Sequence, residues 1–374
     1  MELLNSLVKV QPIKIAYLVV VAVLELFKVP FWSILYLLSS QRPHPKWTLV
    51  RAIKIRLFKA YLYHMSKTEF QYPLSLEPGT QGERFVVLDP APAQCYRGVL
   101  DDLKIKPIRI GGTWYPEPYP LDNPAKSSEK VIMHMHGGAF VVGCGRDGDF
   151  GWSAHKLLKN ESFDRIFSVQ YRLAGEHLPG CAFPAAIQDV VTAYYYLVYT
   201  LRIPASNIIV SGDSAGGNLT VALLRYISEH GNTANLPAPS AALLWSPWVN
   251  VGVNVDKNYF TRTPQYKTDY LNGYFGRWGA REYAGKKDPN DPYITHCGRP
   301  FKTDAPIWMQ TGDAEVLIAE DTQFYKEMGS VGNKIEMHIG EGVVHDILLL
   351  GSALGFGREV SDAVKSAGKW YQSL

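Results

Sequence analysis

Short apolar runs alternate with amphipathic stretches along the chain from residue 85 onward. Runs rich in Val, Ile, Leu and Met predict buried strands at 85–88, 106–110, 130–136, 166–172, 207–210, 241–245, 306–310 and 334–339. Helical spacing predicts helices at 184–201, 219–227, 321–328 and 361–374, and Gly111-Gly112 predicts a turn. Strands that alternate with helices are typical of an α/β protein with a mostly parallel, doubly wound sheet.

The first forty residues carry two apolar runs, 16–24 and 29–38, with Glu25 and Lys28 between them. A spanning helix needs about 20 predominantly apolar residues, which 13–38 supplies only if these two side chains pair. No small-residue cleavage site follows a short apolar core, so a signal peptide fits poorly. We expect a single N-terminal anchor in a membrane-associated protein of the endoplasmic reticulum. The alternative is a buried or monotopic helix in a soluble cytoplasmic protein.

Residues 42–67 contain seven Lys or Arg and no acidic residue, with apolar residues near helical spacing. This pattern predicts a basic amphipathic helix. Such a helix can lie on an anionic membrane surface or pack on the domain with a solvated basic face, and both interpretations remain open. We therefore separate an N-terminal region, 1–67, from the domain at 68–374.

Charge and cysteine content narrow the classes of function. The net charge of +3 favours no nucleic-acid partner. The four cysteines are widely spaced and form neither a metal-ligand pattern nor a disulfide framework. We expect no cofactor and no metal, and the pattern leaves the oligomeric state undetermined.

Residues 207–220 combine a β-branched run, the sequence Gly212-Asp213-Ser214-Ala215-Gly216 and a helical pattern. A G-x-S-x-G sequence between a strand and a helix is the context of a nucleophile elbow, which exposes the serine hydroxyl. The helix that follows directs N–H groups toward developing negative charge. Because a bare G-x-S-x-G also arises by chance, an ordinary glycine-rich loop is the alternative.

A second motif supports the catalytic interpretation. The run at 130–136 ends in His136-Gly137-Gly138-Ala139, and a strand that opens into H-G-G-x supplies oxyanion donors in hydrolases. We expect His136 to brace this loop rather than to act as an acid or base.

Five motifs occur in an order that resembles one family: H-G-G-A at 136–139, Y-R-L-A-x-E-H at 171–177, F-P-A-A-x-x-D at 183–189, G-D-S-A-G-G at 212–217 and G-x-x-E-V-L at 312–317. Together they resemble the hormone-sensitive-lipase-type esterases of the α/β-hydrolase fold, from about residue 130 to the C-terminus. The apolar N-terminus and G-D-A-E-V-L are also similar to fungal membrane-bound acetyl-ester (steryl acetate) hydrolases. The resemblance implies an α/β-hydrolase fold whose cap is formed by the N-terminal helices and an insertion at about 249–304.

The resemblance assigns roles to individual residues. Ser214 is the expected nucleophile, and His345, after the last strand, is the expected base. The family's acid stands two residues before a Leu, which favours Glu315; Asp313 is the second choice. The expected oxyanion donors are Gly138, Ala139 and Ala215. Glu176, His177 and Asp189 match positions that we interpret as structural.

The implied function is a serine carboxylic-ester hydrolase acting through an acyl-enzyme on a small lipophilic ester, with a short acyl chain. An elimination, cyclisation or isomerisation enzyme that uses the same site is the alternative. A hormone-receptor-like binding protein is more remote, because related receptors lack the histidine. Several aromatic residues could line the substrate pocket or simply pack the cap, namely Trp152, Trp248, Tyr259, Tyr270 and Trp278.

Overall fold

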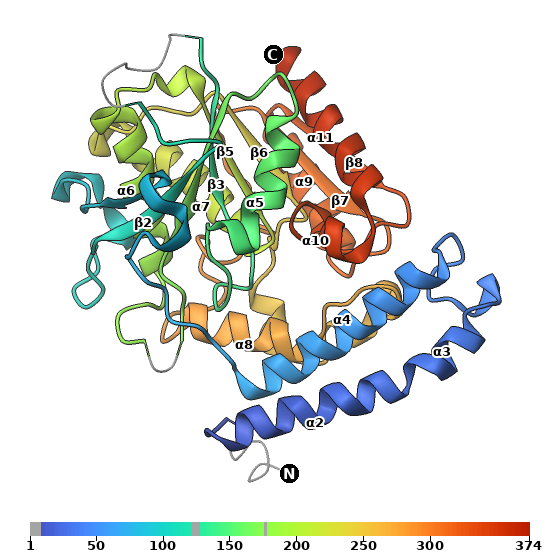
Figure 1. Cartoon of the computed structure of the whole chain (residues 1–374). Coiled ribbons are helices and arrows are strands. Elements are labelled where there is room, and N and C mark those ends of the chain that lie inside the picture. The colour runs from blue at the N-terminus through green and yellow to red at the C-terminus, as the bar shows by residue number, and fades with distance from the viewer. Residues whose placement is uncertain (1–8, 121–127, 176–177) are drawn as a thin grey trace.

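A twisted sheet of eight strands forms the centre of the molecule (Figure 1). The computed structural model describes residues 9–120, 128–175 and 178–374. The strand order is β1-β2-β4-β3-β5-β6-β7-β8; β2 runs antiparallel to β1 and β4, and the other pairs are parallel. The strands are β1 (Phe85–Leu88), β2 (Ile110–Tyr115), β3 (Val131–Met135), β4 (Arg165–Gln170), β5 (Ile208–Asp213), β6 (Ala241–Trp245), β7 (Ile307–Gly312) and β8 (Ile335–Gly340). The expected mostly parallel α/β sheet is confirmed.

The second strand corrects the sequence interpretation. We expected a strand at 106–110 followed by a turn at Gly111-Gly112, but both glycines lie inside β2 and pair with β1 and β4. A Cβ on Gly111 would lie 2.2 Å from Phe85 Cζ, and one on Gly112 would lie 2.1 Å from Phe167 Cζ. The glycines therefore make room for aromatic rings across the sheet rather than reversing the chain.

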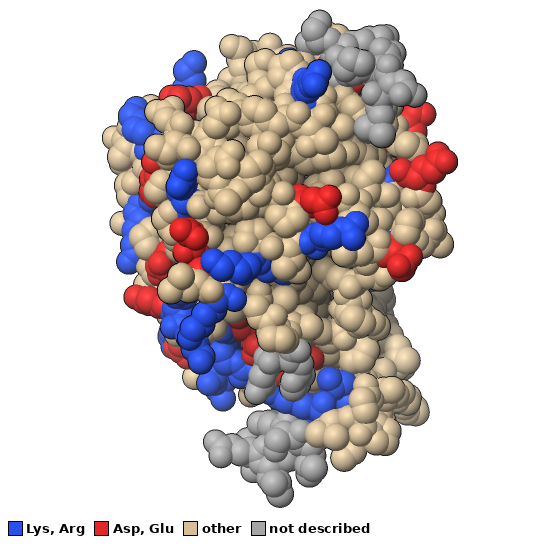
Figure 2. Space-filling model, turned by 90° about the vertical axis from the view of Figure 1, so that its left-hand side faces the viewer, with Lys and Arg blue, Asp and Glu red and all other residues tan. Residues whose placement is uncertain are grey.

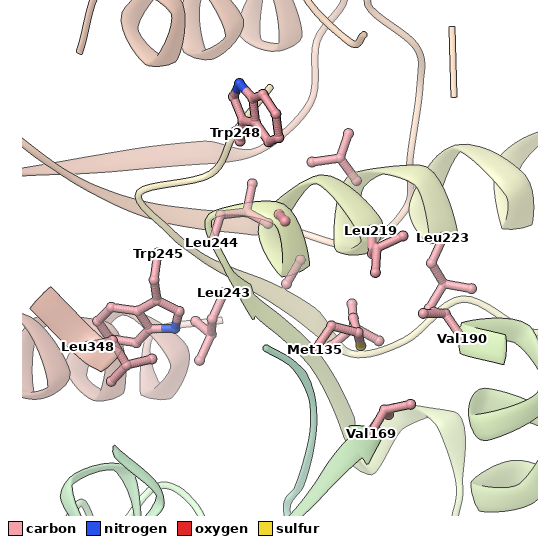
Figure 3. Packing of buried hydrophobic residues seen from close by; sticks show 14 of the residues in the cluster. Met135, Val169, Val190, Leu219, Leu223, Leu243, Leu244, Trp245, Trp248 and Leu348 are labelled. Atoms are coloured by element: carbon pink, nitrogen blue, oxygen red, sulfur yellow. The ribbon is translucent and has the colours of Figure 1, made fainter. Parts of the chain in front are cut away.

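Helices cover both faces of the sheet. The helices α5 (Asp147–Leu158) and α11 (Gly357–Gln372) pack together on one side, and α6 (Ala185–Tyr195) and α7 (Ala215–Ala234) on the other (Figure 1). Leu219 and Leu223 of α7 point toward Met135 and Val190 in the core (Figure 3). This double coverage explains why the central strands read as continuous apolar runs. Two further helices, α9 (Ile318–Ser330) and α10 (Ile347–Leu354), follow β7 and β8.

The segment at 249–304 lies beside the carboxyl ends of the parallel strands. It contains short 3₁₀ turns and the helix α8 (Gly273–Ala284), which packs on α4 (Leu49–Thr68). A Cβ on Gly279 would lie 2.4 Å from the Ala139 carbonyl oxygen, so α8 sits directly on the H-G-G-A loop. The helices α4 and α8 lie side by side in Figure 1, and Phe58 of α4 and Phe275 of α8 line the same cavity as Ser214.

The helix α4 uses much of its basic side in contacts within the chain. Arg51 pairs with Glu359 at 2.8 Å, Lys59 donates to the Asp269 carbonyl oxygen at 2.9 Å, and Arg56 lies over the Trp32 ring at 4.6 Å from its centroid. The packed arrangement therefore accounts for these cations without a membrane. Acidic and basic side chains are both scattered over the face shown in Figure 2.

Two N-terminal helices lie outside this arrangement. The helix α2 (Ile13–Phe27) runs along α4, and α3 (Val29–Leu35) continues it (Figure 1). All 15 residues of α2 remain exposed or half-buried. The segment Ile13–Leu35, which contains an 18-residue stretch of mean hydropathy 2.1, is long and apolar enough to cross a membrane, as judged by length and composition.

Candidate active site

Ser214 stands at a strained turn between β5 and α7, with φ 49° and ψ −114°. A side chain in this region of conformational space is costly and is typical of a nucleophile elbow. The turn needs its glycines, because a Cβ on Gly212 would lie 2.2 Å from the Gly216 carbonyl oxygen and one on Gly216 would lie 1.9 Å from the Met135 carbonyl oxygen. The G-x-S-x-G pattern thus reflects backbone contacts as well as chemistry.

His345 approaches Ser214 from the loop after β8. Its Nε2 lies 2.9 Å from Ser214 Oγ, and both side chains are buried. Burial lowers the pKa of His345 to about 3, so the imidazole is neutral near pH 7 and can accept the serine proton. The next residue, Asp346, fixes the loop: its N–H donates to Ser246 Oγ at 3.0 Å.

Glu315, rather than Asp313, lies beside the imidazole. Glu315 Oε2 is 3.8 Å from His345 Nδ1, which is longer than a hydrogen bond, and Nδ1 has no hydrogen-bond partner among the described residues. Ser246 donates to the same Oε2 at 2.7 Å. Asp313 is exposed and accepts from the Gly342 N–H at 2.6 Å, which holds the turn after β8. A shift of about 1 Å would bring Glu315 Oε2 within hydrogen-bond distance of His345 Nδ1.

A second carboxyl group, Asp321 of α9, completes this cluster. Thr311 Oγ1 contacts both Glu315 Oε1 and, at 2.8 Å, Asp321 Oδ2, and all three side chains are buried. A hydroxyl group has one hydrogen to donate, so the second contact requires a proton on a carboxyl group. Burial and then the charge of Glu315 raise the pKa of Asp321 well above its ordinary value. Because Ser246 also donates to Glu315, we place that proton on Asp321.

The sequence alone gives no role to Asp321, Thr311 or Ser246. None of them stands in a motif that names its role. The one available signal was position, since Asp321 opens the helix that follows the turn carrying Glu315. Three-dimensional contacts were needed to bring two carboxyl groups onto one hydroxyl.

The H-G-G-A loop lies around the same cavities as Ser214, since Ala139 lines the smaller one and Gly138 the larger one. Gly138 and Ala139 have φ values of 109° and 53°, and a Cβ on Gly138 would lie 2.1 Å from the Val142 carbonyl oxygen. Within the described residues, the N–H groups of Gly138, Ala139 and Ala215 have no acceptor. The Gly137 N–H, by contrast, donates to Asp213 Oδ2 at 2.7 Å. Three unpartnered N–H groups near a serine are the geometry that an oxyanion hole requires.

His136 lies beneath this loop. Its Nδ1 donates to the Gly137 carbonyl oxygen at 2.7 Å, and its ring stacks on Tyr171 with centroids 4.3 Å apart. Burial lowers its pKa, so the ring is neutral.

Asp189 forms a buried ion pair with Arg172 at 2.7 Å. Glu176 and His177 lie outside the described residues.

Two cavities of different size reach Ser214. The smaller, about 10 Å³, is lined by Ala139, Ser214, Trp248, Phe260, Leu271, Phe275, Gly276 and Leu317. The larger, about 530 Å³, is lined by residues of α4, α5, α10, the H-G-G-A loop and the segment at 249–304, and it includes Ser214 and His345. Of the five aromatic residues singled out above, Trp152 and Tyr270 line the larger cavity and Trp248 lines the smaller, whereas Tyr259 and Trp278 line neither. Among the described residues, no group of His, Cys, Asp and Glu could hold a metal ion.

The fold and this site define an α/β hydrolase, and comparison with known proteins agrees. The sequence profile described as alpha/beta hydrolase fold matches residues 132–349. The chain belongs to this family.

Several similar proteins are named as esterases, acetyl-hydrolases or lipases. An acetyl-hydrolase of Streptomyces hygroscopicus is 26% identical over 52% of this chain and 60% of its own length. An esterase of Acinetobacter venetianus is 26% identical over 66% of this chain and 79% of its own length. A solved hormone-sensitive lipase from a metagenome library has 25% identity and a TM-score of 0.57, covering 71% of this chain and 82% of that one. The resemblance to hormone-sensitive-lipase-type esterases is confirmed, and the chain is a carboxylic ester hydrolase.

Proposed function

We propose that this carboxylic ester hydrolase works through Ser214, His345 and Glu315. Ser214 Oγ attacks the ester carbonyl carbon while His345 Nε2 takes its proton. The carbonyl oxygen of the ester becomes negatively charged and accepts hydrogen bonds from the backbone N–H groups of Gly138, Ala139 and Ala215. Glu315 moves within hydrogen-bond reach of Nδ1 and stabilises the imidazolium. The observation that carries the proposal is the 2.9 Å contact between Ser214 and His345 beside donors that lack acceptors.

The second half of the reaction uses the same groups. His345 returns the proton to the alkoxide, so the alcohol leaves and the acyl group stays on Ser214. Water then gives a proton to His345 and attacks the acyl carbon, and collapse of the second tetrahedral state frees the acid and reprotonates Ser214. No cofactor enters any step.

We further infer a small acyl group on a bulky, lipophilic alcohol. A volume of about 10 Å³ beside Ser214 holds about one water-sized group, which suits the methyl group of an acetyl ester. The cavity of about 530 Å³ has many aromatic and aliphatic side chains in its lining, among them Phe58, Met65 and Leu350, and it suits a large apolar alcohol. The name of the Streptomyces relative, an acetyl-hydrolase, supports the same preference.

We also propose that the enzyme associates with a membrane through α2 and α3. Their apolar side chains are exposed, with Phe27 at 77% and Ile34 at 71%. Such a surface is unfavourable in water and favourable in lipid. A lipophilic ester would be concentrated in the same place.

A fluorophosphonate probe tests the reaction class on the detergent-solubilised full chain. We expect the wild type to be labelled and Ser214→Ala to be unlabelled and to lose ester hydrolysis by a factor on the order of 10⁴ or more. Hydrolysis of p-nitrophenyl esters should fall from acetate to butyrate to octanoate. Unchanged turnover in Ser214→Ala would refute the proposal, and a rearranged product without released acid would point to the elimination alternative.

A further inference from the structure

A further cavity, mostly apolar, lies between the N-terminal helices α2 and α4. It measures about 590 Å³ and is bounded by α2 on one side and α4 on the other. We call it the α2–α4 groove; its lining residues from α2 include Leu18, Val19, Ala22 and Leu26, and those from α4 include Leu57 and Ala60. The catalytic mechanism makes no use of it.

Glu25 and His64, which line the α2–α4 groove, already have polar partners. Glu25 forms an ion pair with Lys28 at 2.6 Å. His64 Nδ1 lies 2.7 Å from the Tyr17 hydroxyl, and burial lowers the pKa of His64, which favours the neutral ring. A hydrogen-bonding or charged ligand would therefore find little to bind there, whereas a hydrocarbon chain would bury apolar surface.

The α2–α4 groove meets the catalytic cavity. Four residues, Tyr61, Met65, Phe70 and Tyr72, line both spaces. Tyr61 and Tyr72 are 56% and 73% exposed, so neither side chain is locked in place by packing. The end of α4 is thus the shared wall between Ser214 and the groove.

The opposite side of α2 is apolar and bare. Val20, Val23, Leu24 and Phe27 are 47–77% exposed, in a segment long enough to cross a membrane. A helix that is apolar all round is expected to be covered by protein or lipid. Here α4 covers one side, and a lipid bilayer is the environment that suits the other.

We propose that the α2–α4 groove is the entry path by which a lipophilic ester passes from the bilayer to Ser214. This inference rests on the proposed function. The apolar alcohol portion would enter along α2, pass between Tyr61 and Tyr72, and leave the ester carbonyl beside Ser214. A molecule dissolved in lipid would then reach the site without its hydrocarbon crossing water, which would be unfavourable in proportion to its apolar area.

Filling the groove tests this path. Ala60 of α4 and Ala22 of α2 line the groove but not the catalytic cavity, so Ala60→Trp and Ala22→Trp would block it from opposite sides. Val20→Trp is the matched control, because Val20 is 57% exposed and does not line the groove. The full-length chain is reconstituted in phosphatidylcholine vesicles and assayed with hexadecyl acetate in the bilayer and with p-nitrophenyl acetate in water.

We expect both groove variants to lower kcat/KM for hexadecyl acetate by about tenfold or more, while p-nitrophenyl acetate hydrolysis stays within about twofold of wild type. Val20→Trp should match the wild type on both substrates. Equal rates in all four proteins would overturn the entry path and leave the esterase assignment intact. A parallel loss of both substrates in both groove variants would also overturn it, because the groove would then support catalysis rather than access. A wild type that hydrolyses neither ester would instead contradict the proposed function.

Discussion

The buried cluster around His345 and the N-terminal helices place side chains in opposite environments. In the cluster, His345, Glu315 and Asp321 are titratable groups buried in the protein. In α2, apolar side chains such as Phe27 are exposed. Burial shifts proton affinities in the first region, and exposure leaves apolar surface without a partner in the second. The chemistry is therefore built into the domain, whereas the N-terminal helices depend on what surrounds them.

Because of this difference, substitutions in the two regions should affect different sets of substrates. A buried carboxyl group must be paired or protonated whatever lies outside the protein, so substitutions in the cluster should act on every substrate. Substitutions on α2 should act only on substrates that come from lipid. The predictions below test the cluster and the cavity beside it, from the largest effect to the smallest.

The largest effect is expected at the carboxylate beside His345. Glu315→Gln keeps the shape of the side chain but removes the charge that stabilises the imidazolium, so kcat should fall on the order of 10²–10⁴-fold. Asp313→Asn is the control, because Asp313 binds the Gly342 N–H away from the imidazole, and its kcat should stay within about threefold of wild type. Steady-state hydrolysis of p-nitrophenyl acetate measures both. The reverse order of effects would transfer the role to Asp313.

A smaller effect is expected at the wall of the small cavity. Phe260 lines that cavity and not the larger one. Phe260→Ala should enlarge it and raise the ratio of butyrate to acetate kcat/KM by about tenfold, because an extra methylene or two would then fit. Tyr259→Phe, next along the chain and lining neither cavity, should leave the ratio unchanged. An unchanged ratio of butyrate to acetate kcat/KM in Phe260→Ala would mean that the acyl group does not bind in the small cavity.

The smallest effect on kcat is expected at Asp321, which carries the proton in its contact with Thr311. Asp321→Asn should keep a donor toward Thr311 and Glu315 and retain kcat within about threefold, whereas Asp321→Ala should lower it further. The pKa of Asp321 is raised in the folded protein, so the folded state binds the proton more tightly than the unfolded chain. Wild-type stability should therefore fall, relative to Asp321→Asn, as pH rises above about 4, by about 1.4 kcal/mol per pH unit until the folded group ionises.

Urea unfolding of both proteins at pH 5, 6 and 7 measures this difference. Burial also raises the pKa of the neighbouring Glu315 and Glu320, but both groups remain in the variant, so their contributions largely cancel. A constant difference in stability across this range would mean that Asp321 carries no proton in the folded protein.

Much of the fold could be predicted from the chain. Runs of β-branched and aliphatic residues predicted most of the strands, because strands buried on both faces have few polar positions. The prediction failed at Gly111-Gly112. Local turn propensity favours a turn there, but the rings of Phe85 and Phe167 require two residues without side chains in mid-strand. Those rings come from neighbouring strands, so no local pattern could have revealed them.

The amino-acid sequence by itself determined the parallel α/β architecture, the elbow at Ser214 and the glycines that the H-G-G-A loop needs, because these depend on short-range periodicity and on backbone geometry. Only the tertiary structure decided that Glu315 faces His345, that Glu315 and Asp321 share the hydroxyl group of Thr311, and that α2 lies along α4 beside the cavity at Ser214. Each of these depends on residues far apart in the chain that meet only when the sheet and its helices pack.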